Sequence, residues 1–382
     1  MEHAAETSVS RYFGTLTDPR IDRAKEHRLL DIITIVLCAV LCGADDWVAI
    51  ETFGRAKEAW LRGFLSLPSG IPSHDTFGRV FARLNPTEFR TCFVAWVQAV
   101  TGAAVANGVV AVDGKTLRRS HDRQQGKAAL HLVSAWASAT DLVLGQVATD
   151  QKSNEITAIP VLLRLLALEG CTVTIDAMGC QTAIAAQLVE QRADYVLALK
   201  DNHPTLHERA RLAFDDARAG RTTTPAELDQ ARSLDKDHGR IEQRRCWALG
   251  GPDYLAYLDP TRVWAGLQSV ALIESTRRIG DQVSLERRYY LSSLPPDAAV
   301  LGQAIRAHWG IENRLHWVLD VAFREDDSRF RSGDGPENLA IVRHVALNLL
   351  RREPGRASTA KKRFRAALDD RYLRTLLDQL HD

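Results

Sequence analysis

Two aspartates in this sequence directly follow short runs that are predicted to be β-strands. An acidic group in this position is poorly placed for burial unless a cation or a hydrogen-bond donor lies nearby. Asp113 follows the apolar run 109–112, and Asp176 follows the run 172–175, which consists of threonine, valine and isoleucine. Because side chains at the carboxyl ends of strands face the ligand crevice of an α/β sheet, we expect both carboxylates at one site. Carboxylate oxygens are the ligands that Mg²⁺ and related divalent ions prefer. Either aspartate alone is equally well explained as the cap of a turn, but the pair favours a metal-dependent site.

Glu312 is the third candidate, and it lies in a segment that is expected to be helical. The segment places Ile305, Trp309, Glu312 and His316 on overlapping helix faces at three- and four-residue spacing. A carboxylate in a mostly apolar stripe is costly unless it has a partner. The spacing leaves two partners open, namely an arginine in an ion pair or a bound metal ion.

Strands that alternate with helices are expected to position the two aspartates. The strands are predicted at 109–113, 130–138, 142–149, 171–176 and 194–199, and the helices at 154–169 and 180–191. The order β-β-β-α-β-α-β indicates a mixed sheet flanked by helices, which belongs to the α/β class.

Three further regions surround this core. Residues 1–105 have apolar residues at helical spacing and predict an all-helical N-terminal domain. Within the catalytic region 106–332, residues 201–295 interrupt the alternation and predict a β-rich insertion, followed by a long helix over 297–321. The segment 333–382 predicts a basic helical tail, which either binds the DNA backbone or is a solvated amphipathic helix. The strands of the insertion are expected near 241–248, 269–275 and 285–292.

The overall composition excludes several other classes of protein. With 382 residues, 45% of them hydrophobic, and a net charge of +1, the chain is globular and any nucleic-acid surface must be local. Its six cysteines include no Cys-x-x-Cys pair, which favours a reducing, cytoplasmic compartment and disfavours a structural zinc site. The most apolar run, 29–44, is too short for a membrane span, so no membrane partner is expected. The absence of a Walker or dinucleotide fingerprint predicts no nucleotide cofactor.

Several phrases around the candidate residues occur together and in order. They are VDGKTLRRS, TIDAMGCQ, LALKDNHPTLH, HGRIEQR and HWGIENRLHWVLDVAFREDDSR, preceded by DPRIDRAKEHRLLDIITIVLCAVLCGADDW and LPSGIPSHDTFGRVFARL. With these phrases the chain resembles the DDE transposases, and among them the ISAs-type insertion-sequence transposases, which include the H-repeat-associated proteins. The resemblance covers about residues 10–350 and therefore nearly the whole chain.

The resemblance implies an RNase H-like core with Asp113, Asp176 and Glu312 as catalytic, metal-binding carboxylates. The cofactor would be Mg²⁺ or Mn²⁺, with two ions per active site about 3.5–4 Å apart. Asp113 would bridge both ions, while Asp176 and Glu312 would each hold one. The site would first cut DNA at the ends of a bacterial insertion sequence, and the freed 3′-hydroxyl would then attack target DNA.

The partners implied are double-stranded DNA, as terminal inverted repeats and as target, and a second copy of the chain in the DNA complex. The helical N-terminal domain is the expected reader of the ends, and the protein is expected in the cytoplasm, associated with the nucleoid when bound to DNA. Two other functions stay open, a catalytically silent DNA-binding descendant and a metal-dependent nuclease without strand transfer.

Basic residues just beyond the site elements are candidates for phosphate contacts. We expect this role for Lys115, Arg118, Arg119, Lys200, Arg314, His316 and Arg329. Related transposases often have an arginine four residues before the third carboxylate and a lysine seven residues after it, where this chain has His308 and Leu319. Arg314, His316 or Arg306 would then supply the missing contacts. Stacking on an unpaired base is open to Trp136, Trp309 and Trp317, but core packing is favoured for all three.

Overall fold

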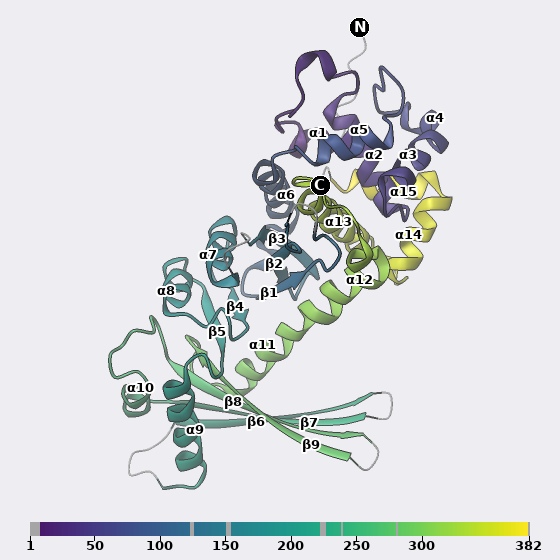
Figure 1. Cartoon of the computed structure of the whole chain (residues 1–382). Helices are drawn as coiled ribbons and strands as arrows, with labels where there is room; N and C mark the ends of the chain where they lie inside the picture. Colours follow the sequence, from purple (N-terminus) through teal and green to yellow (C-terminus); the bar gives the residue numbers. More distant parts are fainter. Residues whose placement is uncertain are drawn as a thin grey trace.

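The computed structural model describes residues 8–122, 126–149, 154–221, 227–237, 240–279 and 282–380. A nine-stranded mixed sheet runs through the molecule in the order β3-β2-β1-β4-β5-β9-β8-β7-β6 (Figure 1). Helices flank much of this sheet, and a helical bundle stands at its β3 end. The predicted α/β class with a mixed sheet is confirmed, and the order 3-2-1-4-5 of the first five strands is RNase H-like.

Those five strands carry the two candidate aspartates. They are β1 (Val109–Thr116), β2 (His131–Ala137), β3 (Leu142–Ala148), β4 (Thr172–Ile175) and β5 (Asp194–Leu199). β1 pairs antiparallel with β2 and parallel with β4, and β4 pairs parallel with β5. All five lie where the sequence predicts strands, as do the helices α7 (Glu155–Leu165) and α8 (Thr182–Glu190). β1 continues past Asp113 because its pairing with β2 extends to Thr116.

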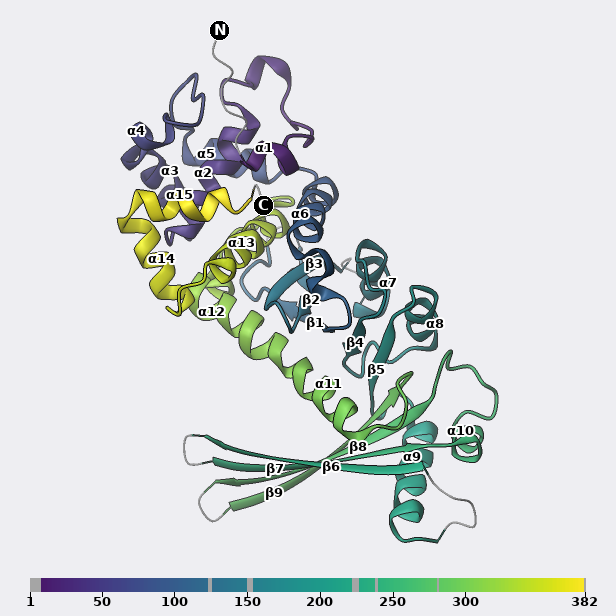
Figure 2. The same ribbon diagram turned by 180° about the vertical axis from the view of Figure 1, so that it is seen from behind.

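The insertion continues the same sheet. β9 (Gln282–Ser292) pairs antiparallel with β5, and β8 (Ser269–Ile279), β7 (Arg240–Gly250) and β6 (Glu227–Asp237) follow outward. We call these four strands the β-arm, because they reach beyond the helices at their base (Figures 1 and 2). β6 was not predicted, since its sequence ELDQARSLDKD lacks the alternation of apolar and polar residues that marks a half-buried strand.

Helices cover the two faces of the β-arm at its base. On one face, α9 (Pro204–Arg218) places Phe214 beside Tyr289, and α10 (Pro252–Leu258) lies next to α9. On the opposite face, α11 (Ala298–Gly310) packs Leu301 and Ile305 in a cluster with Tyr290. Tyr289 and Tyr290 point to opposite faces because successive residues of a strand alternate.

The long helix predicted over 297–321 is present, but its hydrogen bonding changes midway. After α11 the chain makes a π-helical turn, η3 (Ile311–His316), and then α12 (Trp317–Phe323) and the short η4 (Glu325–Asp327). π-Helical turns are rare and often occur at functional sites. Gly310 stands at the start of this turn, where an added Cβ atom would be 2.4 Å from the ring of Trp136. The absence of a side chain at Gly310 therefore allows the helix to lie close to β2.

The N-terminal and C-terminal helices form one bundle. The N-terminal set is α1 (Ser8–Phe13), η1 (Asp22–Ala24), α2 (Leu29–Leu41), α3 (Trp47–Ala56), α4 (Glu58–Leu61), α5 (His74–Phe81), α6 (Pro86–Thr101) and η2 (Gly102–Val105). The C-terminal set is α13 (Gly335–Arg352), α14 (Thr359–Leu368) and α15 (Asp370–Asp378). In the part of the chain that the structure describes, no helix is long and apolar enough to cross a membrane.

α13 connects this bundle to the sheet. Its Asn338 amide donates hydrogen bonds of 2.8 Å to the carbonyls of Phe81 and Leu84, and its Asn348 amide exchanges two with the backbone of Val143 in β3. Nearly all of α13 is buried. The C-terminal segment is thus helical as predicted, but its first helix belongs to the core and is neither a tail nor a solvated surface.

Candidate active site

The three predicted carboxylates line one cleft. Its volume is about 200 Å³, and its walls come from Asp113 within β1, from the carboxyl ends of β4 and β5, from β9 and from the α11–η3 helix. Val112 of β1 is paired with Ile175 of β4, so Asp113 and Asp176 follow a matched pair of residues on neighbouring parallel strands. The strand register therefore brings the two aspartates together, and the π-helical turn brings Glu312 to the same cleft.

Asp113 is largely buried and surrounded by negative charge. Burial raises the pKa of Asp113 to about 7, and the charges of Asp176, Glu155 and Glu312 add to this rise, while a backbone hydrogen bond at Gly114 opposes it. A carboxylate in this environment holds its proton near neutral pH unless a cation replaces it. The site thus favours the binding of positive charge at Asp113.

Asp176 also caps the turn that follows β4. Its Oδ1 accepts hydrogen bonds from the backbone N–H groups of Met178 and Gly179, at 3.0 and 3.4 Å. Burial raises the pKa of Asp176, followed by the charge of Glu155, whereas these hydrogen bonds and Lys200 act in the opposite direction. The sequence left two roles open for Asp176, the cap of a turn and a carboxylate of the site. In the structure the same side chain caps the turn and lines the cleft.

Glu312 is exposed on the π-helical turn and lines both the cleft and an adjoining groove of about 290 Å³. Among the residues that the structure describes, no arginine forms an ion pair with Glu312. The ion-pair alternative for this glutamate is therefore not supported.

Oxygen donors dominate the polar lining of the cleft, as Mg²⁺ or Mn²⁺ requires. Within the described ranges, no three His, Cys, Asp or Glu side chains already stand close enough together to hold a metal ion. The donor chemistry therefore fits a divalent ion, while the side chains are not gathered around one point.

Comparison with known proteins decides the family. Two family models match the chain, "DDE_Tnp_1-associated" over residues 10–97 and "Transposase DDE domain" over residues 106–349. The chain belongs to the DDE transposase family. It is 38% identical to the H repeat-associated putative transposase YhhI of Escherichia coli strain K12, over 97% of both chains. It is 47% identical to an uncharacterized protein in the dhlA 3′ region of Xanthobacter autotrophicus, over 75% of this chain and 94% of that one. A piggyBac transposase synaptic complex with hairpin DNA aligns over 97% of this chain and 77% of that chain, with a TM-score of 0.40 and 11% identity.

Lys115 of the transposase differs from its expected role as a phosphate contact. Its ammonium group pairs with Asp320, with Glu325 at 2.9 Å and with Asp326 at 3.7 Å, and its side chain is 12% exposed. Glu325 in turn lies 3.7 Å from the guanidinium of Arg343 in α13. This buried network joins the strand of Asp113 to α12 and to the helical bundle, so Lys115 is not free to reach DNA.

His316 also differs from its expected role, because it faces the aspartate of the transposase site and not the solvent. Its Nδ1 lies 3.6 Å from Oδ2 of Asp113, and burial lowers the pKa of His316 to about 4. The imidazole is therefore neutral at neutral pH and adds no positive charge for a phosphate.

Four other predicted DNA contacts, Lys200, Arg118, Arg119 and Arg314, are exposed. Lys200 lines the cleft and lowers the pKa of Asp176. Arg118 pairs with Asp326 and Arg119 with Asp327, both at 3.2 Å, and Arg314 pairs with Asp141 at 3.0 Å. Arg306, the further candidate, pairs with Asp235 at 2.9 Å.

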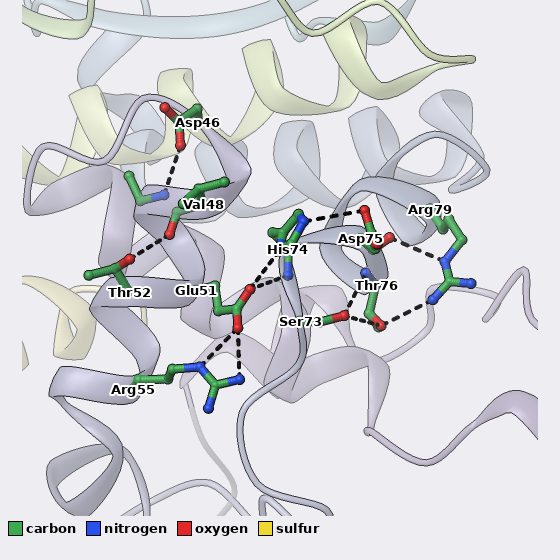
Figure 3. Close-up of polar contacts among 11 residues, drawn as sticks. Asp46, Val48, Glu51, Thr52, Arg55, Ser73, His74, Asp75, Thr76 and Arg79 are labelled. Atoms are coloured by element: carbon green, nitrogen blue, oxygen red, sulfur yellow. Dashed lines mark hydrogen bonds and ion pairs between the residues drawn. The ribbon is translucent and has the colours of Figure 1, made fainter.

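Arg329 lines a different groove, of about 680 Å³, which shares no lining residue with the carboxylate cleft. This groove lies between the segment around Phe330 and the starts of α3 and α5. Figure 3 shows how these starts are held: Asp46 accepts a hydrogen bond at the start of α3, and His74 at the start of α5 donates to Glu51. Arg329 therefore adjoins the N-terminal helices of the transposase and not its carboxylates.

The three tryptophans divide between core and surface. Trp136 is buried against Gly310, as core packing predicts. Trp317 is 61% exposed, so core packing is wrong for it. Trp309 is 39% exposed in the wall of the cleft, where the guanidinium of Arg288 lies 4.6 Å from its ring centroid.

Glu155 and His131 were missed as neighbours of the transposase carboxylates. Their side chains are joined by a hydrogen bond of 2.7 Å, and the charge of Glu155 acts on both aspartates. The sequence does contain a signal for Glu155. Asn154 is a helix cap directly before it, which puts Glu155 at the start of the helix that follows the third strand.

Proposed function

We propose that this DDE transposase cuts DNA at the ends of an insertion sequence and joins the freed 3′-hydroxyl to target DNA. Asp113, Asp176 and Glu312 would hold two divalent ions, Mg²⁺ or Mn²⁺. Such ions, when bound, stabilise the attacking and the leaving oxygen of a phosphodiester. The supporting observation is that the three carboxylates, from two neighbouring strands and one helix, line a single cleft.

The chain's own groups suit this reaction in distinct ways. Asp113, in the strand between β2 and β4, is more buried than Asp176 and Glu312, and it would hold divalent ions together with them. Asp176 is oriented by two backbone N–H groups, which leaves its second oxygen for the cleft. No serine or tyrosine nucleophile is required, because water and then the 3′-hydroxyl attack the phosphate directly.

Exposed basic groups would hold the DNA backbone beside the cleft. We propose this role for Lys200, Arg118, Arg119 and Arg314, while Arg329 would contact DNA along the groove beside the N-terminal helices. Those helices would read the terminal inverted repeats, and two copies of the chain would act on two ends. Lys115 and His316 are left out because buried contacts engage both.

The test is cleavage and joining of a labelled duplex that carries the element's own ends, with Mg²⁺ or with EDTA. We expect metal-dependent nicks followed by joined products, and loss of both in Asp113→Asn with end binding retained. Asp253→Asn, an exposed aspartate at the start of α10, is the matched control. Cleavage by Asp113→Asn would contradict the assignment of this residue. Binding without cleavage would indicate a silent descendant, and cleavage without joining would indicate a nuclease.

A further inference from the structure

A fourth carboxylate stands beside the two aspartates of the proposed site. Glu155 is the first residue of α7, and its side chain is only 14% exposed. Its Oε1 accepts a hydrogen bond from Nε2 of His131, at 2.7 Å. The other ring nitrogen of His131, Nδ1, lies 2.8 Å from the hydroxyl of Thr116, which fixes the orientation of the ring. Glu155 is therefore held in place by two strands, β1 and β2.

The space for this pair exists because residue 114 is a glycine. A Cβ atom at Gly114 would stand 2.0 Å from Oε1 of Glu155 and 2.5 Å from Nε2 of His131. Gly114 directly follows Asp113, so the Glu155–His131 pair lies against the strand next to the first catalytic carboxylate. No other residue type fits this position without moving the pair.

The charge of Glu155 acts on both aspartates. It raises the pKa of Asp113, and among charged neighbours it is the first cause of the raised pKa of Asp176. Glu312 acts on Asp113, but it is not among the causes for Asp176. Glu155 is not among the residues that line the cleft, and its contact with Gly114 puts it on the face of β1 opposite to the Asp113 side chain.

A purely structural role does not require a carboxylate at position 155. Helix α7 is capped by Asn154, whose side chain accepts a hydrogen bond from the N–H of Ile156 at 3.1 Å. A glutamine at position 155 would still offer an oxygen to His131. A glutamine at this position would therefore keep the hydrogen bond to His131 and remove only the negative charge.

We propose that Glu155 is a positioning residue of the active site, which adds negative charge behind Asp113 and Asp176 and thereby strengthens their hold on a divalent ion. This inference rests on the proposed function. His131 keeps the carboxylate in place, and Gly114 leaves room for it. Residues of this outer kind typically contribute about 10- to 100-fold to metal affinity.

The experiment compares Glu155→Gln, which keeps the acceptor for His131 and removes the charge, with the wild-type protein. Mn²⁺ binding to the complex with the end duplex is measured by calorimetry, and the Mg²⁺ concentration for half-maximal cleavage is measured in parallel. We expect about 10-fold weaker Mn²⁺ binding and a similar rise in the Mg²⁺ requirement. Duplex binding in EDTA should stay unchanged. Glu190→Gln, at the exposed end of α8, is the matched control and should behave as wild type.

Gly114→Ala provides a second variant that leaves Glu155 itself intact. Its added methyl group should displace the Glu155–His131 pair and weaken Mn²⁺ binding in the same direction. Wild-type metal binding and metal dependence in Glu155→Gln would overturn the inference while leaving the proposed function standing. A wild-type protein that neither binds Mn²⁺ nor cleaves would overturn the proposed function and the inference with it.

Discussion

The strands near the aspartates and the strands of the β-arm both bury carboxylates, but they differ in how far the cations paired with them are exposed. Near β1, Lys115 and Glu325 form an ion pair in which the side chains are 12% and 1% exposed. On the β-arm, Arg277 lies 3.9 Å from Glu242 with side chains that are 47% and 7% exposed, and Arg287 pairs with Glu274 with side chains that are 45% and 10% exposed. A pair in which both partners are buried fixes geometry, because neither can be removed cheaply, whereas a half-exposed arginine contributes less and can exchange partners. The first region therefore suits the placement of carboxylates, and the second suits contact with a charged ligand.

The largest difference between the regions should come from Lys115→Met. This change leaves Glu325 buried without its closest cation, and such a loss costs about 3–5 kcal/mol of unfolding free energy. Urea denaturation followed by circular dichroism measures it. If Lys115 instead contacted DNA, the Lys115→Met variant would keep its unfolding free energy and lose affinity for the duplex.

The buried charges near β1 should also make stability depend on pH through His344 of α13. Burial lowers the pKa of His344 to about 4 from an ordinary value of 6.5. The unfolded chain therefore takes up a proton between these values that the folded chain does not. Stability should fall as the pH drops from 6.5 toward 4, by up to about 3 kcal/mol from this group.

The measurement is the urea midpoint at pH 7.5 and at pH 5. His344→Gln should reduce the difference between the two midpoints. An equal difference in the variant and the wild type would show that other groups carry the effect. The described strands of the β-arm contain no histidine and add nothing to this window.

A smaller effect is expected where the π-helical turn meets β2. Gly310→Ala would place a methyl group against the ring of Trp136, and overpacking of this kind costs about 1–3 kcal/mol. Because Glu312 follows two residues later, cleavage should fall together with thermal stability. Gly302→Ala, whose methyl group would meet Cys246 at an ordinary 3.4 Å, is the control on the same helix. Unchanged cleavage and melting in Gly310→Ala would show that the helix has room to move.

The smallest effect on stability is expected in the β-arm. Arg277→Met removes a half-exposed cation while Glu242 keeps Arg244 at 2.6 Å, so the unfolding free energy should change by less than about 1 kcal/mol. A loss of several kcal/mol in the same denaturation experiment would erase the distinction between the two regions.

The sequence was sufficient for the features that depend on local pattern. The runs before Asp113 and Asp176 predicted strands, and their position at the strand ends predicted a shared cleft. The contacts of Lys115 and Glu155 could not be predicted from the sequence. Lys115, for example, meets Asp320 and Glu325 more than 200 residues along the chain. The segment 333–382 was predicted to be a basic helical tail, and the burial of α13 could not be foreseen because the backbone partners of Asn338 and Asn348 are distant in sequence. The π-helical turn has no sequence signal that periodicity reveals.

The position of α13 has a consequence for how the protein is made. This helix is synthesised after the N-terminal helices and the sheet, yet it fills the centre of the bundle and binds the carbonyls of Phe81 and Leu84. During synthesis, the apolar faces of the N-terminal helices that pack on α13 therefore stay uncovered until α13 has been made. We expect a chain that is cut short before residue 335 to leave these faces exposed and to form no stable bundle.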